Sequence, residues 1–260
     1  MSQSRRAFVQ HLGIGTIGIA GAGILAGCGG NNTNPTVQVP GSPASGESKV
    51  LTAGAEVLQS MPPIKQINMY LDGFHFYADD MGRQVEAHHF CIMLNEDLHQ
   101  CVIFDSNGEK ARLIGVEYIV SEKLFKTLPD DEKYFWHSHH YEVKSGELIM
   151  PGIPDTVEHA AMEKLITTYG KTWHMWQVDR RDELPLGIPQ LMMGFTKDGQ
   201  ANASLVSDRD QRFGVSTDSK KANRQDIPMP TLIPGANGWE QSGKTVWLDT
   251  KVVPVKNLKT

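Results

Sequence analysis

The fold is decided by two β-prone runs, Glu86-Ala-His-His-Phe-Cys-Ile-Met-Leu94 and Gln100-Cys-Val-Ile-Phe-Asp105, which the polar residues 95–99 separate. Two apolar runs of this length joined by a short polar loop are typical of an antiparallel hairpin. After a turn at 106–108, the run 113–120 has the same character and predicts a third strand. An antiparallel sheet is therefore the expected framework of the chain.

Beyond this sheet, helical and extended patterns alternate. Ser121 is expected to cap a helix, because a serine side chain accepts hydrogen bonds from the free N–H groups at a helix start. The longest expected helix spans Pro154 to Tyr169, with apolar residues at helical spacing and Gly170 just beyond its end. The other expected elements are helices at 122–128, 129–136 and 204–213, an extended segment at 141–150, and strands at 172–178 and 189–195.

These elements predict the α+β class, with a mostly antiparallel sheet and helices packed on one side. A single globular domain is expected over residues 61–240. Residues 241–260 are expected to form a C-terminal tail, in which Thr245 to Val253 is a candidate edge strand. With 40% hydrophobic and 21% charged residues, the composition is that of an ordinary soluble domain.

The N-terminus has the features of an export signal. Arg5 and Arg6 followed by an apolar residue resemble a twin-arginine signal. The apolar stretch 12–25 is too short to span the roughly 30 Å core of a bilayer. Leu25-Ala-Gly-Cys28 then resembles a lipobox, in which the cysteine thiol accepts a diacylglycerol. We predict a signal peptide at 1–27 and lipidation of Cys28; the alternative is a simple membrane anchor or a soluble secreted protein.

This N-terminus predicts a location in the bacterial cell envelope, lipid-anchored at the periplasmic or outer-membrane face after twin-arginine export. Residues 29–48 have almost no large apolar side chains, so the segment 28–60 is expected to be a flexible tether. The expected partners are the membrane, through the lipidated N-terminus, and lipid; no protein partner is indicated. A net charge of −5 without a dense basic stripe argues against nucleic acid.

Ionisable side chains concentrate between Trp136 and Gly152. In an extended segment His137 and His139 would share one face, whereas His140 and Glu142 would fall on the other. Two or three imidazoles with a carboxylate suit zinc, iron or manganese, with one position left open for water. This stretch is therefore the candidate metal site.

The predicted hairpin adds further imidazoles. His88 and His89 are adjacent in a strand, so only one of them can point toward the first pair, and His75 is a further candidate. The alternatives to a metal site are a hydrogen-bonded structural network and metal-free acid–base catalysis by a histidine–glutamate pair. No catalytic residue is assigned. The candidate cluster is His88, His89, His137, His139 and Glu142, with His137, His139 and His88 as the metal ligands.

Cys91 and Cys101 lie in the two arms of the hairpin with matching strand parity, so their side chains are expected on one face. A disulfide between them would form in an oxidising compartment. A twin-arginine substrate folds before export, in a reducing compartment. We therefore expect two buried free thiols, with the disulfide as the alternative.

Short motifs in order along residues 60–240 carry a family resemblance. They are Arg83 to His89, Leu94 to Asp97, Ala111 to Tyr118, Trp136 to His139, Tyr141 to Gly146, Tyr169 to Trp173, Trp176 to Arg180, Leu184 to Gly187 and Arg212 to Thr217. Together they resemble the oil body-associated protein family. The resemblance implies lipid storage droplets for the plant members and no defined activity, and it carries over no catalytic or binding residue. Because the lipobox implies an envelope location, a lipid-droplet role does not transfer directly.

Two hypotheses of function follow. The first is a non-enzymatic envelope lipoprotein, tethered through Cys28, whose globular domain binds lipid or a partner. The second is a metal-dependent enzyme that uses His137, His139 and one of His88, His89 or Glu142. The second hypothesis requires histidines that are distant in sequence to converge around a space open to water.

Overall fold

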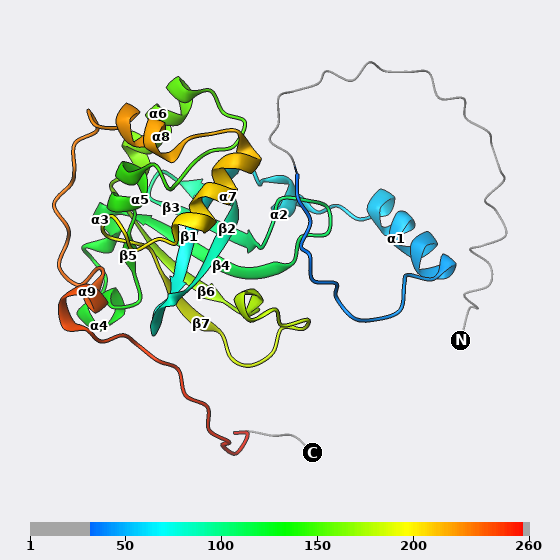
Figure 1. The fold of residues 1–260 in the computed structure, drawn as a ribbon. Helices are drawn as coiled ribbons and strands as arrows, with labels where there is room; N and C mark the ends of the chain where they lie inside the picture. Colours follow the sequence, from blue (N-terminus) through cyan, green and yellow to red (C-terminus); the bar gives the residue numbers. More distant parts are fainter. Residues whose placement is uncertain (1–31, 257–260) are drawn as a thin grey trace.

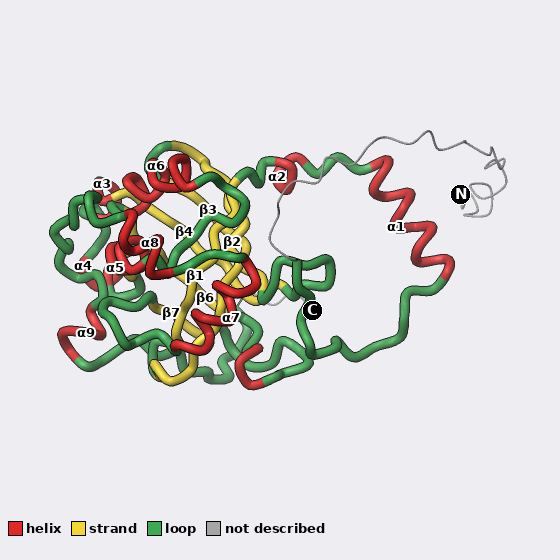
Figure 2. The backbone as a smooth tube through the Cα atoms, turned by 45° about the horizontal axis from the view of Figure 1, so that its top comes forward, coloured by secondary structure: helices red, strands yellow, loops and turns green. Residues whose placement is uncertain are grey.

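The structure is a computed structural model that describes residues 32–256 (Figure 1). The predicted signal peptide and the predicted lipidation site, Cys28, lie outside these residues. Helix α1 (Gly46–Leu58) buries none of its residues and stands apart from the body of the chain (Figures 1 and 2). The short helix α2 (Pro62–Lys65) then leads into the first strand. The domain boundary at residue 61 stays a prediction.

Antiparallel strands form one sheet in the order β4-β3-β2-β1-β7-β6-β5. The predicted hairpin is confirmed as β2 paired with β3, and the predicted third strand is confirmed as β4. The strands are β1 (Met69–Tyr77), β2 (Asp80–Asn95), β3 (Leu98–Phe104), β4 (Leu113–Ser121), β5 (His137–Ser138), β6 (Thr168–His174) and β7 (Gln190–Met193).

The sheet closes on itself. Strand β4, at one end of the order, pairs with β6 from Gly115 opposite His174 to Ser121 opposite Thr168. Six strands therefore enclose an interior, and β5 pairs with part of β6. The predicted α+β class and antiparallel sheet agree with the structure. The expectation of helices on one side is corrected, because a closed sheet has an inside, an outside and two ends.

Helices cover the outside and one end of the closed sheet (Figure 1). Helix α7 (Ala203–Phe213) packs on the outer faces of β1 and β2. Helices α5 (His140–Ser145) and α6 (Asp155–Leu165) cover one end, where their apolar residues join those of the strands. The remaining helical segments are α3 (Glu122–Phe125), α4 (Asp130–Lys133), η3 (Val178–Arg180), α8 (Thr217–Asn223) and α9 (Gly238–Ser242).

The interior consists of a polar layer between two apolar layers, because alternate residues of each strand point inward. The layer beneath α5 and α6 is apolar and includes Leu71 and Leu165. Tyr77 and Met192 belong to the apolar layer at the other end. The inward strand residues of the polar layer between them are His75, His89, Glu117, Thr172 and His174.

Two predicted elements differ from the structure. The segment predicted as extended, 141–150, begins instead with α5, which ends at Gly146 in the left-handed conformation with φ of 83°. The helix predicted over 154–169 stops early, and Gly170 lies inside β6. The cause is tertiary, because residues 168–174 find a full-length strand partner in β4. Helical spacing within the segment could not reveal that partner.

Cys91 and Cys101 form a disulfide, so the prediction of free thiols is wrong. The two residues lie directly opposite each other in the register of β2 and β3, with their Cα atoms 4.0 Å apart. Both point into the apolar layer beneath α6. Strand parity alone did not decide whether the two cysteines lie directly opposite or diagonally. The observed register places them directly opposite, so their sulfur atoms are within bonding distance.

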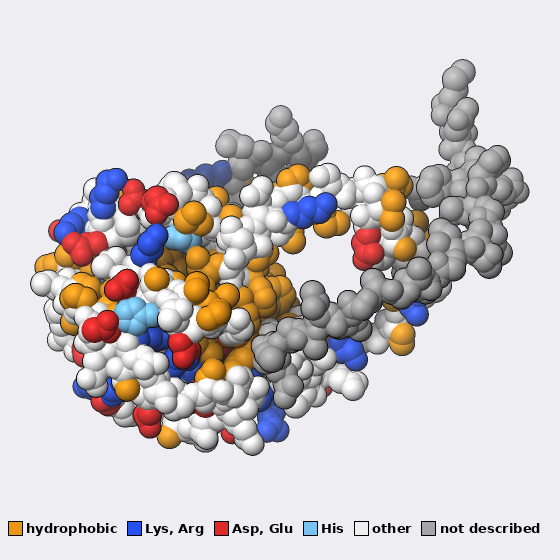
Figure 3. Space-filling view, turned by 90° about the horizontal axis from the view of Figure 1, so that it is seen from above, with side chains coloured by type: hydrophobic (Ala, Val, Ile, Leu, Met, Phe, Trp, Pro, Cys, Tyr) orange, Lys and Arg blue, Asp and Glu red, His pale blue; other side chains and the backbone are white. Residues whose placement is uncertain are grey.

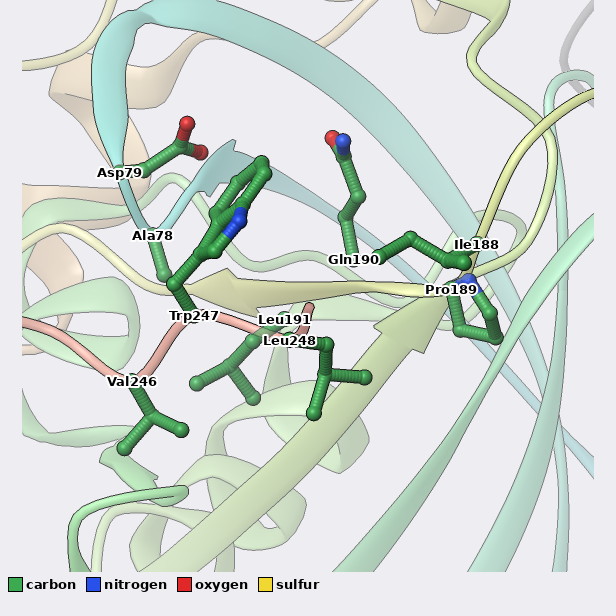
Figure 4. Close-up of a pocket in the computed structure, with 9 residues that line it drawn as sticks. All are labelled: Ala78, Asp79, Ile188, Pro189, Gln190, Leu191, Val246, Trp247 and Leu248. Atoms are coloured by element: carbon green, nitrogen blue, oxygen red, sulfur yellow. The ribbon is translucent and has the colours of Figure 1, made fainter. Parts of the chain in front are cut away.

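The C-terminal segment adds no strand to the sheet, and beyond residue 248 it runs away from the body of the domain (Figure 1). Residues 245–253, the candidate edge strand, have no strand partner among residues 32–256. Instead, Val246 and Trp247 lie beside Ala78 and Leu191 around a small cavity (Figure 4). Contact of the segment with the domain is thus made by the side chains of residues 246–248 beside β7.

Candidate metal centre

Five histidines and two glutamates meet in the polar layer inside the closed sheet, and all seven are buried. They come from five strands and from the start of α5, so only the closure of the sheet brings them together. They are His75 on β1, His89 on β2, Glu117 on β4, His137 on β5, His139 and Glu142 at α5, and His174 on β6.

The carboxylate of Glu117 stands at the centre of this group. Its Oε1 lies 3.2 Å from His139 Nε2 and 3.6 Å from His137 Nε2. Its Oε2 lies 2.8 Å from His89 Nε2 and 3.9 Å from His75 Nε2. Ligands of a tetrahedral zinc ion lie about 3.4 Å from one another, since each is about 2.0–2.1 Å from the ion. The four contacts are therefore spaced as ligands of a metal would be.

The ring of His139 is oriented by Thr168. The hydroxyl of Thr168 donates to the carbonyl of Leu165 at 2.7 Å, so it accepts from His139 Nδ1, also at 2.7 Å. In the neutral imidazole Nε2 is then an acceptor, and it faces Glu117 Oε1, a second acceptor. A proton or a metal cation between these two atoms makes the contact favourable. Metal-binding histidines are commonly oriented by a hydrogen bond of this kind on the other ring nitrogen.

Several ring nitrogens of the cluster are buried without a hydrogen bond. Among the residues that the structure describes, neither nitrogen of His137 or His174 has a hydrogen-bond partner, and Nδ1 of His89 also has none. Nδ1 of His75 and Oε2 of Glu142 are also buried without a hydrogen-bond partner among the described residues. A buried polar atom left unpaired costs about 1–3 kcal/mol, so a whole group of them calls for an explanation. A bound metal would satisfy many of these atoms at once.

Two glycines keep space open beside the cluster. A Cβ atom at Gly170 on β6 would overlap Glu117 Oε1 and lie 2.8 Å from His139 Nε2. A Cβ atom at Gly194, just after β7, would lie 2.9 Å from Glu142 Oε2. Any larger residue at either position would fill the space between the ligand atoms. The absence of a side chain at Gly170 and Gly194 therefore keeps the space beside the ligand atoms open.

The charge states of the buried groups suit a divalent cation. Burial lowers the pKa of His137 and of His174 to about 3, so both are neutral and able to bind a metal at neutral pH. Burial raises the pKa of Glu117, but the imidazoles of His139 and His89 outweigh it, and the pKa lies well below its ordinary value. Glu117 is therefore an anion beside the uncharged rings of His137 and His174.

Glu142 differs in charge from Glu117. Burial, followed by repulsion from Glu117 and Glu147, raises the pKa of Glu142 well above its ordinary value. Its Oε2 lies 3.9 Å from His137 Nε2. Glu142 thus holds a proton next to the cluster and can release it when a cation binds.

A small cavity adjoins the cluster. His75, Glu117 and Glu142 are among the residues on its polar side, and Leu148 and Leu165 are among those on its apolar side. Its volume of about 10 Å³ is enough for about one water molecule. A metal held by the cluster would therefore have room for one water ligand on the side that faces α5 and α6.

Comparisons with known proteins place the chain in a family. The model of a family described as a protein of unknown function (DUF1264) matches residues 61–228. Oil body-associated protein 1A of Zea mays is 55% identical over 188 residues, which are 72% of this chain and 79% of that protein. Oil body-associated protein 1B of Arabidopsis thaliana is 45% identical over 232 residues, 88% of this chain and 95% of that protein. This chain belongs to the oil body-associated protein family. No solved structure matches it.

The relatives contradict the predicted localisation. They are proteins of Zea mays and Arabidopsis thaliana, and their names associate those proteins with oil bodies. The prediction of a bacterial envelope location is therefore wrong, and the motifs at Arg5, Arg6 and Cys28 that led to it lie outside the described residues. Within residues 32–256, no helix is both long enough and apolar enough to cross a membrane.

In this oil body-associated family member, the structure brings together most of the predicted site residues. His137, His139 and His89 surround Glu117, as does His75, which the sequence suggested as a further candidate. Glu142 was expected on the face of His140. Because α5 is a helix and not a strand, Glu142 turns back toward His137 instead.

His88 does not join the cluster. It pairs with Asp72 in the register of β1 and β2, on the outer face of the sheet. Its Nδ1 lies 2.8 Å from Tyr70 Oη and 3.0 Å from Asp72 Oδ2. The assignment of His88 as a metal ligand with His137 and His139 is therefore corrected, because adjacent strand residues point to opposite faces.

Glu117 and His174 belong to the cluster but were not among the residues predicted from the sequence. Glu117 interrupts the apolar run 113–120 at a position between Ile114 and Ile119, both of which are buried. Burying a carboxylate in a strand costs free energy unless the carboxylate is paired. An acidic residue inside this apolar run therefore indicated that a partner for Glu117 lies in the interior. For His174, the alternating pattern of the strand at 172–178 predicted only that its side chain lies on a partly buried face.

Proposed function

We propose that this protein binds a divalent transition metal, zinc, iron or manganese, inside its closed sheet. The observation that carries the proposal is the convergence of four imidazoles on the carboxylate of Glu117, at 2.8–3.9 Å. The unpaired ring nitrogens and the space at Gly170 support it. The proposal develops the second hypothesis from the sequence with a corrected set of ligands.

The donor atoms favour a metal over a purely structural network. A network of histidines and glutamates would pair its donors and acceptors, whereas here both ring nitrogens of His137 and of His174 have no hydrogen-bond partner among the described residues. Imidazole nitrogen with carboxylate oxygen is a donor set that zinc, iron and manganese accept. When bound, such a metal would polarise a water ligand in the adjoining cavity, and Glu142 would hold or release a proton beside it.

Elemental analysis of the full chain tests this proposal. The protein is purified without a nickel column, reconstituted with zinc, iron or manganese, and desalted. We expect stoichiometric metal in the wild type and none in the double variant His137→Ala, His139→Ala, because each ring lies within 3.6 Å of Glu117.

The matched control for this test is His140→Ala. His140 is also buried, but its ring packs against Tyr169 instead of Glu117. This variant is expected to keep the metal. A wild-type protein that takes up none of the three metals, and whose melting temperature none of them raises, would refute the proposal.

We also propose association with a lipid surface. The names of the relatives support this, since they associate those proteins with oil bodies. Hydrophobic side chains gather on the face seen in Figure 3, between the globular body and the arm formed by α1 and α2. A separate observation is a hollow lined by residues that include Ile67, Phe90 and Met150. Met93 and Leu94 are exposed at the end of β2, the strand that contains Phe90.

Flotation with a triacylglycerol emulsion coated with phospholipid tests this second proposal. The variant Met93→Ser, Leu94→Ser removes two apolar side chains that are 47% and 51% exposed. It is expected to reduce the floating fraction several-fold, because each apolar group contributes to binding in proportion to its buried area. The control is Leu186→Ser, which alters a similarly exposed leucine in the loop before β7. Equal flotation of all three proteins would argue against this surface.

A further inference from the structure

We propose that the cluster holds two metal ions, bridged by the carboxylate of Glu117. The inference rests on the proposed metal-binding function and adds the number of ions and the role of each ligand. Each oxygen of Glu117 would bind one ion, so the site would be a dinuclear centre of divalent first-row metals.

The two oxygens of Glu117 face separate pairs of histidines. His137 and His139 lie at Oε1 and come from β5 and the residue before α5. His75 and His89 lie at Oε2 and come from β1 and β2. A carboxylate between two pairs of imidazoles is the arrangement expected of a bridging ligand. A single ion bound at one oxygen of Glu117 would leave the pair of rings at the other oxygen without a metal.

The number of donors also exceeds what one ion needs. A mononuclear zinc site with an open position uses three protein ligands. Here two overlapping groups have ligand atoms within 4.8 Å of one another, namely His75 with Glu117 and His137, and His137 with His139 and Glu142. The groups share His137, so their five side chains offer more donors than one ion needs.

His174 lies near the pair of rings at Oε2, formed by His75 and His89. Its ring centre is 5.6 Å from that of His75, and neither of its ring nitrogens has a hydrogen-bond partner among the described residues. The ion at Oε2 would therefore have His75 and His89 as ligands, with His174 beside them. The ion at Oε1 would have His137 and His139, with Glu142 beside them.

The spacing and the two carboxylates fit a pair of ions. Metals in two-metal sites lie about 3.5–4 Å apart, a distance that the two oxygens of one carboxylate can bridge. The carboxylate of Glu117 presents one oxygen to each pair of rings, and a second carboxylate, Glu142, has its Oε2 3.9 Å from His137 Nε2. The adjoining cavity holds about one water molecule, which would supply the remaining ligand as water or hydroxide.

Manganese titration of the metal-free full chain tests the inference. We expect two equivalents of Mn(II) to bind per chain, with the electron paramagnetic resonance spectrum of a spin-coupled pair. His89→Ala, which removes a ligand at Oε2, is expected to bind one equivalent and to give the spectrum of an isolated ion. His140→Ala is the control and is expected to bind two.

The outcomes separate the two proposals. Binding of one equivalent by the wild type, with an isolated-ion spectrum, would overturn the dinuclear centre and leave the metal-binding function standing. The titration is repeated with zinc and with iron, and binding of none of the three metals by the wild type would overturn both proposals. Because the titration of the wild type decides the number of ions by itself, the test remains decisive if His89→Ala fails to fold.

Discussion

Replacing Arg209 with methionine is expected to lower the free energy of unfolding by about 3–5 kcal/mol, the cost of leaving a buried charge without its partner. Arg209 is fully buried, and its Nη1 donates to Asp72 Oδ1 at 3.1 Å and to the carbonyl of Glu147 at 2.7 Å. These contacts join α7 to β1, so their loss weakens the packing of the helix on the sheet. Urea denaturation followed by circular dichroism measures the effect.

Arg212→Met is the matched control for this prediction. Arg212 lies three residues further along the same helix and pairs with Glu86, but its side chain is 27% exposed. A partly exposed ion pair contributes about 0–1 kcal/mol, so this variant is expected to lose little. If Arg209→Met costs no more than Arg212→Met, then the pair between Arg209 and Asp72 does not hold α7 in place.

The variant Gly170→Ala is expected to abolish metal binding while the chain stays folded. The new methyl group would overlap Glu117 Oε1 and lie 2.8 Å from His139 Nε2, in the space where a metal would lie. The backbone accepts alanine, because Gly170 lies in β6 and has no positive φ. Overpacking of this kind costs about 1–3 kcal/mol, less than the stability of a typical domain. Elemental analysis of the monodisperse fraction from size-exclusion chromatography measures the metal content.

Gly73→Ala controls for the effect of an extra methyl group inside the sheet. A Cβ atom at Gly73 would meet only Leu148 Cδ1, at 3.2 Å, and that flexible side chain can shift. This variant is expected to bind metal as the wild type does. Full metal content in Gly170→Ala would show that the ion lies elsewhere.

Local sequence patterns predicted the strands and turns whose partners are near in sequence. The hairpin of β2 and β3 has a two-residue connection, so the pairing of its two arms follows from the runs of β-prone residues and the polar turn between them, although its register does not. The cap of α3 was predicted on the same basis, since Ser121 accepts from the N–H of Leu124 within one turn. Such features depend on atoms only a few residues apart.

The candidate site was predicted only in part. His137 and His139 are close in sequence, and a strand of any length places them on one side. Glu117 joins them only because β4 pairs with β6, whose Gly170 lies opposite His137 on β5. No local pattern reports a pairing between residues about fifty positions apart, and so the central carboxylate was missed.

The amino-acid sequence by itself determined the family, the antiparallel hairpin and the concentration of imidazoles near Trp136. These features depend on the order of residues and on short-range backbone geometry. The tertiary structure decided that the sheet closes, that His89 and not His88 faces the interior, and that Cys91 meets Cys101. It decided these points because register and closure depend on which strands meet, and a shift of one residue moves every side chain to the opposite face.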